Sequence, residues 1–269
     1  MPRLPAPPLP KVLLPKPKRP GDNGANGPMT PGEALEEAGI TVVDWIDERT
    51  SLSGVIRWTL FRKVPRGINW FYTLGSATLF AFLNQAVTGV ILAMYYRPDA
   101  TSAYESIRNI NDNVFLGQFV HGMHKWGASV MIILIFLHMA RTFFFGAYKY
   151  PRELTWVIGV TLLILTLAMG FTGYLLPLDN RAYWATIAGT NINAGGPFIG
   201  PYLTDFLLGA PDFGATTLSR FYAIHMLLIP GAMIALIGAH IYLVTKLGIT
   251  APPYLKVDEE PELQPQAEV

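Results

Sequence analysis

Long apolar runs alternate with short polar connections along most of this 269-residue chain. Four of the runs cover residues 68–96, 114–140, 154–178 and 221–245. Each is longer than the roughly 20 residues that an α-helix needs to cross the hydrocarbon core of a bilayer. The pattern therefore predicts an all-α membrane protein, a bundle of four transmembrane helices.

The segments outside the bundle have different patterns. Residues 1–31 hold ten of the 22 prolines and five basic residues, so we expect a disordered basic extension, either solvated or touching anionic lipid. Residues 32–66 mix apolar and charged positions at near-helical spacing, which predicts an amphipathic helix at the membrane interface. Residues 67–248 form the predicted four-helix domain, and the acidic, proline-rich residues 249–269 predict a disordered tail.

The composition agrees with a membrane protein. Apolar residues make up 51% of the chain and charged residues 14%, whereas soluble domains carry about 25% charge. The sequence has no cysteine. This excludes disulfides, thiolate ligands and thioether attachment of a cofactor.

Lysine and arginine residues near the ends of the runs set the predicted orientation. They are dense before the first run, in the second connection and after the fourth run, and sparser in the first and third connections. By the positive-inside rule, both termini and the second connection are expected in the cytoplasm. The second and fourth helices then run in the same direction. The dense group is Arg57, Arg62, Lys63, Arg66, Arg141, Lys149, Arg152 and Lys246, and the sparse group is Arg97, Arg108, Arg181 and Arg220.

Four histidines lie inside two of the apolar runs, His124 and His138 in the second and His225 and His240 in the fourth. At about 100° per residue, fourteen steps return to within about 40° of the starting direction, and fifteen overshoot by about 60°. Each pair therefore faces one side of its helix, with its members about 21 to 22 Å apart along the axis. Because the two helices are parallel, His124 is expected opposite His225 on the outer side and His138 opposite His240 on the inner side.

Imidazole is a common axial ligand of haem iron, and two imidazoles saturate the iron, which suits electron transfer. We therefore expect two non-covalent b-type haems, the outer one ligated by His124 and His225 and the inner one by His138 and His240. The alternative is that the four histidines are interhelical hydrogen-bonding residues. His121, one turn before His124, is interpreted as a surface or propionate-contacting residue and remains a rival for the outer ligand position.

Glycines repeat the ligand spacing in the first and third helices, and basic residues flank the histidines. A glycine lets a flat cofactor approach the backbone, although glycine is also common where membrane helices pack together. Haem propionates favour cationic partners near the membrane surfaces. The expected haem-facing glycines are Gly75, Gly89, Gly159 and Gly173, and the expected propionate partners are Lys125 and Arg220 for the outer haem and Arg141 for the inner haem. Pro230 is expected to kink the fourth helix.

Several segments together resemble the amino-terminal half of cytochrome b, over residues 43–248. They are NWFYTLGSATL, QAVTGVILAMYYRP, the two histidine helices, YPRELTWVIGV, GFTGYLLPLDNRAYWA and TLSRFYAIH. Thirteen residues separate the ligands in the second helix and fourteen in the fourth, as in the split cytochrome b6. That form has a covalent third haem attached to a cysteine, and this chain has Thr73 there, so no covalent haem c is expected. His121 and Lys125 replace arginines that the family tends to have.

The resemblance implies the redox membrane subunit of a quinol:cytochrome c or plastocyanin oxidoreductase, inactive alone. Electrons would pass from an outer quinol-oxidation site through the two haems to an inner quinone-reduction site, coupled to proton translocation. The third connection, residues 180–208, would cover the quinol pocket as short helices, with Tyr183 and Trp184 as wall residues, unless it is a plain surface loop.

The resemblance also implies partners and a location. The expected partners are quinol and quinone, a separate subunit like subunit IV with the carboxy-terminal half of cytochrome b, a Rieske iron-sulfur protein, a c-type cytochrome and membrane lipid. The complex is expected to be a dimer in a bacterial cell membrane, without nucleic acid. Two alternatives remain open, the two-haem membrane anchor of another respiratory oxidoreductase and a non-redox membrane bundle.

Overall fold

The computed structural model describes residues 31–51, 54, 65 and 67–253, which are helical where they have regular structure and contain no strand. The chain divides into two compact units, residues 1–63 and residues 64–269, and each is described by itself. Most of the predicted basic extension, part of the predicted interfacial segment and residues 254–269 of the predicted tail lie outside the described residues.

The first unit contains helix α1, Pro31–Thr50. Val42, Val43 and Trp45 are exposed on this helix. The guanidinium of Arg49 lies 4.2 Å from the ring centre of Trp45 and donates a hydrogen bond to the Trp45 carbonyl oxygen. Exposed apolar side chains beside charged ones are typical of interfacial helices. The interfacial location of α1 stays a prediction.

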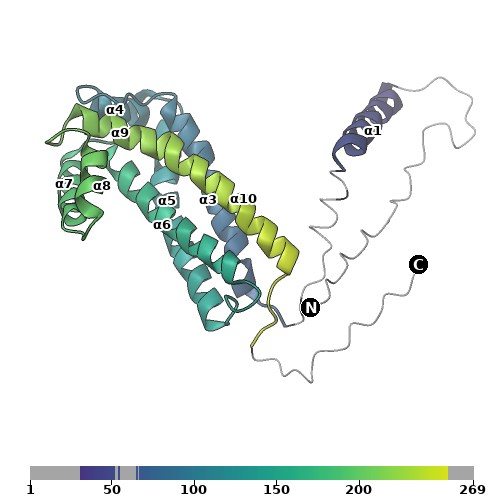
Figure 1. Ribbon diagram of the computed structural model, residues 1–269. Helices are drawn as coiled ribbons and strands as arrows, with labels where there is room; N and C mark the ends of the chain where they lie inside the picture. Colours follow the sequence, from purple (N-terminus) through teal and green to yellow (C-terminus); the bar gives the residue numbers. More distant parts are fainter. Residues whose placement is uncertain (1–30, 52–53, 55–64, 66, 254–269) are drawn as a thin grey trace, which may run out of the picture. The chain divides into compact units, whose positions relative to one another are not determined.

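The second unit contains four helices that are long and apolar enough to span a membrane, as the sequence predicted. The α3 helix packs mainly against α5, α6 packs mainly against α10, and α5 also contacts α6. Figure 1 shows these helices running side by side. The spans are η1 with α3 (Trp70–Thr73 and Leu74–Ala93), α5 (Gly117–Phe144), α6 (Glu153–Leu175), and α9, η2 and α10 in succession (Ala215–Ala223, Ile224–Leu228 and Ile229–Leu247).

Short helices gather at one end of this bundle (Figure 1). They are α4 (Ala103–Asn113) in the first connection, and α7 (Asn180–Ala194) and α8 (Gly200–Leu208) in the third. Short helices were expected in the third connection, whereas α4 was not predicted. The α7 helix begins after Asp179, whose carboxylate accepts a hydrogen bond of 2.7 Å from the Ala182 backbone N–H. This polar cap turns the chain back over the bundle.

The main hydrophobic core lies at the same end as the short helices. Ile110, Leu175, Leu218 and Phe221 are almost fully buried there. Tyr96 joins this core through its ring, and its hydroxyl donates a hydrogen bond of 2.6 Å to the Leu176 carbonyl oxygen. Burial, together with the nearby Tyr222, raises the pKa of Tyr96, so the phenol stays protonated and can donate.

The fourth span contains a single π-helical turn, η2, which includes His225. At its end the Ile229 backbone N–H donates to the Ile224 carbonyl oxygen, five residues earlier. A π turn accommodates one extra residue within a helix. This offsets the fifteen-step spacing between His225 and His240, so that it matches the fourteen steps in α5. Pro230 lies just after this π turn, which is itself a cause of helix bending. The kink at Pro230 stays a prediction.

The Tyr96→Phe substitution is expected to lower the free energy of unfolding by about 1 kcal/mol, because it removes one buried hydrogen bond and leaves the Leu176 carbonyl oxygen without that donor. Thermal unfolding of the detergent-solubilised protein measures the effect. The control is Tyr95→Phe, which removes the hydroxyl of a neighbouring ring that is 45% exposed. Equal unfolding midpoints for the two variants would contradict the prediction.

Candidate functional site

The outer histidines face each other across the bundle. The ring centres of His124 and His225 are 6.3 Å apart, with the ring planes at 76°. Two imidazoles on opposite sides of one metal ion have ring centres roughly 6 to 6.5 Å apart, because each metal–nitrogen bond is about 2.0 to 2.1 Å long. The spacing of this pair therefore fits a single metal ion between the rings.

Hydrogen bonds on the far side of each outer imidazole set its tautomer. His225 Nδ1 lies 3.1 Å from the Met169 carbonyl oxygen, which can only accept, so this nitrogen carries the proton. His124 Nδ1 lies 2.9 Å from the Thr88 hydroxyl oxygen. Thr88 donates its own proton to the Asn84 carbonyl oxygen at 2.6 Å, and it therefore accepts from His124. Both Nε2 atoms are left without protons, as metal ligands require.

The inner histidines form a second level of the bundle. His138 and His240 lie close enough to interact electrostatically. His240 Nδ1 is buried and has no hydrogen-bond partner among the described residues. In the part of the chain that the structure describes, no group of three or more His, Cys, Asp or Glu side chains is placed to hold a metal ion. Two ligands for each metal suit haem, because the porphyrin supplies the other four nitrogens.

Each of the four histidines faces one of the four predicted glycines. A Cβ atom at Gly75 would lie 3.2 Å from Cε1 of His138, and one at Gly89 would lie 3.2 Å from Cε1 of His124. The same atom at Gly159 would lie 3.5 Å from Cε1 of His240, and at Gly173 it would collide with the ring of His225. The glycines thus keep open the space that the rings occupy, and the residues fit a flat cofactor at each level.

The three basic residues predicted to contact haem propionates differ in burial and in hydrogen bonding. Arg141 has its Nε and Nη2 atoms buried without a hydrogen-bond partner in the described chain. Arg220 donates to the Phe206 carbonyl oxygen at the end of α8, and Lys125 is exposed. His121 Nδ1 lies 2.9 Å from the Asn111 side-chain oxygen on α4. Of the predicted cations, Arg141 alone has buried donors without a partner in the described chain.

An apolar hollow of about 340 Å³ lies between α5, α6 and α7. Leu167, Gly170 and Tyr174 share one face of α6 at helical spacing, and Tyr174 follows Gly173, so the hollow is at the level of the outer histidines. A mainly apolar lining suits a quinol ring. This set was not predicted from the sequence, although the repeat on α6 was a visible signal. The complete lining is Ile132, Leu167, Gly170, Phe171, Tyr174, Ala185 and Thr186.

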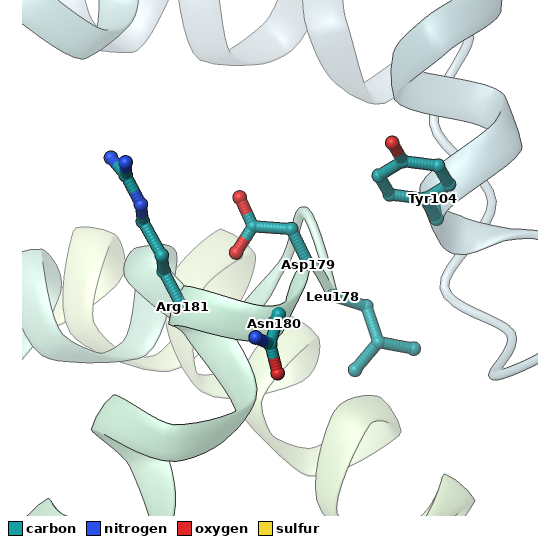
Figure 2. Close-up of a pocket in the computed structure, with 5 residues that line it drawn as sticks. All are labelled: Tyr104, Leu178, Asp179, Asn180 and Arg181. Carbon is teal, nitrogen blue, oxygen red and sulfur yellow. The ribbon is translucent and has the colours of Figure 1, made fainter.

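Tyr183 and Trp184, the predicted wall residues, precede the hollow's lining residues on α7 and are not part of that lining. The ring of Tyr183 packs edge-on against Phe213 with centres 4.8 Å apart, and Trp184 is 61% exposed. A second hollow, of about 530 Å³, lies beside the start of α7 (Figure 2). Its lining includes the charged side chains of Asp179 and Arg181, together with Tyr104, Leu178 and Asn180. That lining suits water or ions better than a quinol ring.

Comparison with known proteins gives consistent matches. Residues 60–248 match the family model described as Cytochrome b/b6/petB. The cytochrome b subunit of menaquinol:cytochrome c reductase from Bacillus subtilis (strain 168) is 42% identical over 219 residues, which are 78% of this chain and 98% of that protein. Cytochrome b6 from Synechococcus sp. (strain RCC307) is 36% identical over 211 residues, 78% of this chain and 97% of that protein.

A solved structure gives a matching fold. A chain of a hyperthermophilic respiratory complex III superposes with a TM-score of 0.73 and 30% sequence identity. The match covers 81% of this chain and 58% of that chain. The present chain thus spans somewhat more than half of the solved one.

The Gly173→Ala substitution is expected to lower the amount of haem bound per chain, because the added methyl group collides with the His225 ring and overpacking of this kind costs about 1 to 3 kcal/mol. A pyridine haemochrome assay of the purified protein measures the haem content per chain. The matched control is Gly238→Ala, since a Cβ at Gly238 meets no atom within 4 Å. An unchanged haem content in the Gly173→Ala variant would show that haem binding does not require the space that this glycine leaves for the His225 ring.

Proposed function

The chain belongs to the cytochrome b/b6 family, and from this premise we propose that it holds two b-type haems as the membrane subunit of a quinol:cytochrome c oxidoreductase of the bc or b6f type. The observation that carries the proposal is the outer pair, in which two imidazoles face each other at 6.3 Å with a glycine opposite each ring.

The residues divide into two haem sites. His124 and His225 would hold the outer haem between Gly89 and Gly173. His138 and His240 would hold the inner haem between Gly75 and Gly159, with Arg141 as the partner of an inner propionate. When bound, the haems supply one-electron transfer across the membrane, from the quinol-oxidising side to the quinone-reducing side.

The chain's other residues orient these ligands and shape the quinol site. Thr88 and the Met169 carbonyl accept the Nδ1 protons of His124 and His225, which fixes both rings and makes them better ligands. The apolar hollow between α5, α6 and α7 would receive the quinol ring at the level of the outer haem. There the apolar walls exclude water from the ring. Tyr183 and Trp184 directly precede Ala185, which lines the hollow from α7.

The proposed partner proteins follow from membership of the cytochrome b/b6 family. We expect a subunit IV-like polypeptide with the carboxy-terminal half of cytochrome b, a Rieske protein and a c-type cytochrome, in a dimeric complex. The four apolar spans make the chain an integral membrane protein. We propose that both termini are cytoplasmic, from the excess of lysine and arginine on that side.

The His124→Ala and His138→Ala variants test the haem assignment. Each is expected to lose one of two non-covalent b haems, because each removes one axial ligand, while the other level keeps both of its ligands. A haemochrome spectrum with haem quantified per chain gives the result. His121→Ala is the control, since the imidazole of His121 is hydrogen-bonded to the Asn111 side chain. No haem, or loss unrelated to the two histidines, would overturn the proposal.

The Ala185→Leu substitution tests the quinol hollow, because a larger side chain fills part of the space that this residue lines. In the assembled complex the KM for quinol is expected to rise at least tenfold, with both haems retained. Ala194→Leu, at the exposed end of α7, is the matched control. Steady-state quinol oxidation and haem content are measured together. Equal KM values for the two variants would place the quinol elsewhere.

A further inference from the structure

An aromatic cage surrounds Arg141 at the inner end of α5, one helical turn after His138. The guanidinium carbon of Arg141 lies 3.7 Å from the ring centre of Tyr72 and 5.1 Å from that of Phe145. The two rings also contact each other, with centres 5.9 Å apart at 58°. A cation stacked on aromatic faces is attracted to them and has a restricted orientation. The cage therefore fixes the direction of the guanidinium group.

The cage leaves several hydrogen-bond donors without a partner. Arg141 Nε and Nη2 and the Tyr72 hydroxyl are buried, and none of them has a partner among the described residues. The ion pairs found in the described chain join Arg49 to Glu48 and Arg108 to Glu105, so they do not involve Arg141. A buried cation in a membrane protein is normally paired with an anion. Buried donors from two neighbouring elements, η1 and α5, thus lie close together without an anion from the described protein.

We propose that Tyr72 and Phe145 position Arg141, and that the Tyr72 hydroxyl and the Arg141 guanidinium donate to one carboxylate, a propionate of the inner haem. This inference rests on the proposed function and adds Tyr72 to the cofactor-binding residues. Its consequence is electrostatic, because a fixed positive charge and a donated hydrogen bond offset the propionate charge and favour the reduced haem. Tyr72 and Phe145 therefore help to raise the midpoint potential of the inner haem.

The test is a redox titration of the full chain in nanodiscs, followed by the visible spectrum of each haem. Tyr72→Phe keeps the ring and removes the hydroxyl, and it is expected to shift the reduction equilibrium of the inner haem about threefold toward the oxidised form. Tyr72→Leu also removes the stacking surface, and it is expected to shift that equilibrium about tenfold, which is about 59 mV for one electron. The outer haem in the same molecule is the internal reference. The inner haem is identified as the component that His138→Ala removes.

The matched control is Tyr242→Leu, which removes another aromatic ring beside a cation, since Lys246 Nζ lies 5.5 Å from the centre of that ring. It is expected to leave both potentials unchanged. An unchanged inner potential in Tyr72→Phe would overturn the inference, even where His138→Ala still loses one haem and the proposed function stands. A shift that appears only with anionic lipid would also overturn it, because a lipid phosphate would then be the anion. If Tyr72→Leu loses the inner haem, the Tyr72→Phe titration decides between these outcomes.

Discussion

The structure of this bundle depends on the opposition of two histidines on α5 to two histidines on the fourth span, and the proposed haem ligation requires an unprotonated Nε2 on each of these rings. The parallel direction of α5 and α10 brings His124 to His225 and His138 to His240. Glycines on the other two spans leave room for all four rings. Hydrogen bonds to Nδ1 hold the outer pair in the ligand tautomer. The π turn then corrects the phase of the one helix whose ligand spacing is longer by a residue.

Two clusters of buried apolar side chains pack the spans. Between the two histidine levels, a small cluster of Ala81, Met131 and Ile135 forms the second buried core. The larger core is centred at the end where α4, α7 and α8 gather, and it reaches between the two levels through Ile229 and Met233 on α10. Much of what fills a helical bundle elsewhere is replaced here by imidazole rings and the cofactors proposed to lie between them.

The length of the apolar runs predicted the four spans, and helical periodicity placed each histidine pair on one side of its helix. The matching spacing of the glycines predicted that they face the haems, and the structure places each of them opposite a histidine ring. The π turn was not predictable in this way, since Ile224, Met226, Leu227 and Leu228 are apolar in any helical register. The α4 helix was not predicted, because it lies in a polar connection. Tyr183 and Trp184 were the predicted wall residues, but the hollow is lined by smaller residues on α7 and by one face of α6. Which face of α6 meets α7 depends on a turn through Leu178, whose φ of +47° is unusual for a leucine.

The pairing of the helices has a consequence for assembly. The first and second spans form one pair that carries His124, His138 and their facing glycines, and the third and fourth spans form another that carries the remaining histidines and glycines. Each haem of the proposed function would therefore take one ligand from each pair. Neither pair alone completes a proposed binding site, so cofactor insertion would follow the entry of both pairs into the membrane. The haems would then join the two halves of the domain, as cross-links as well as electron carriers.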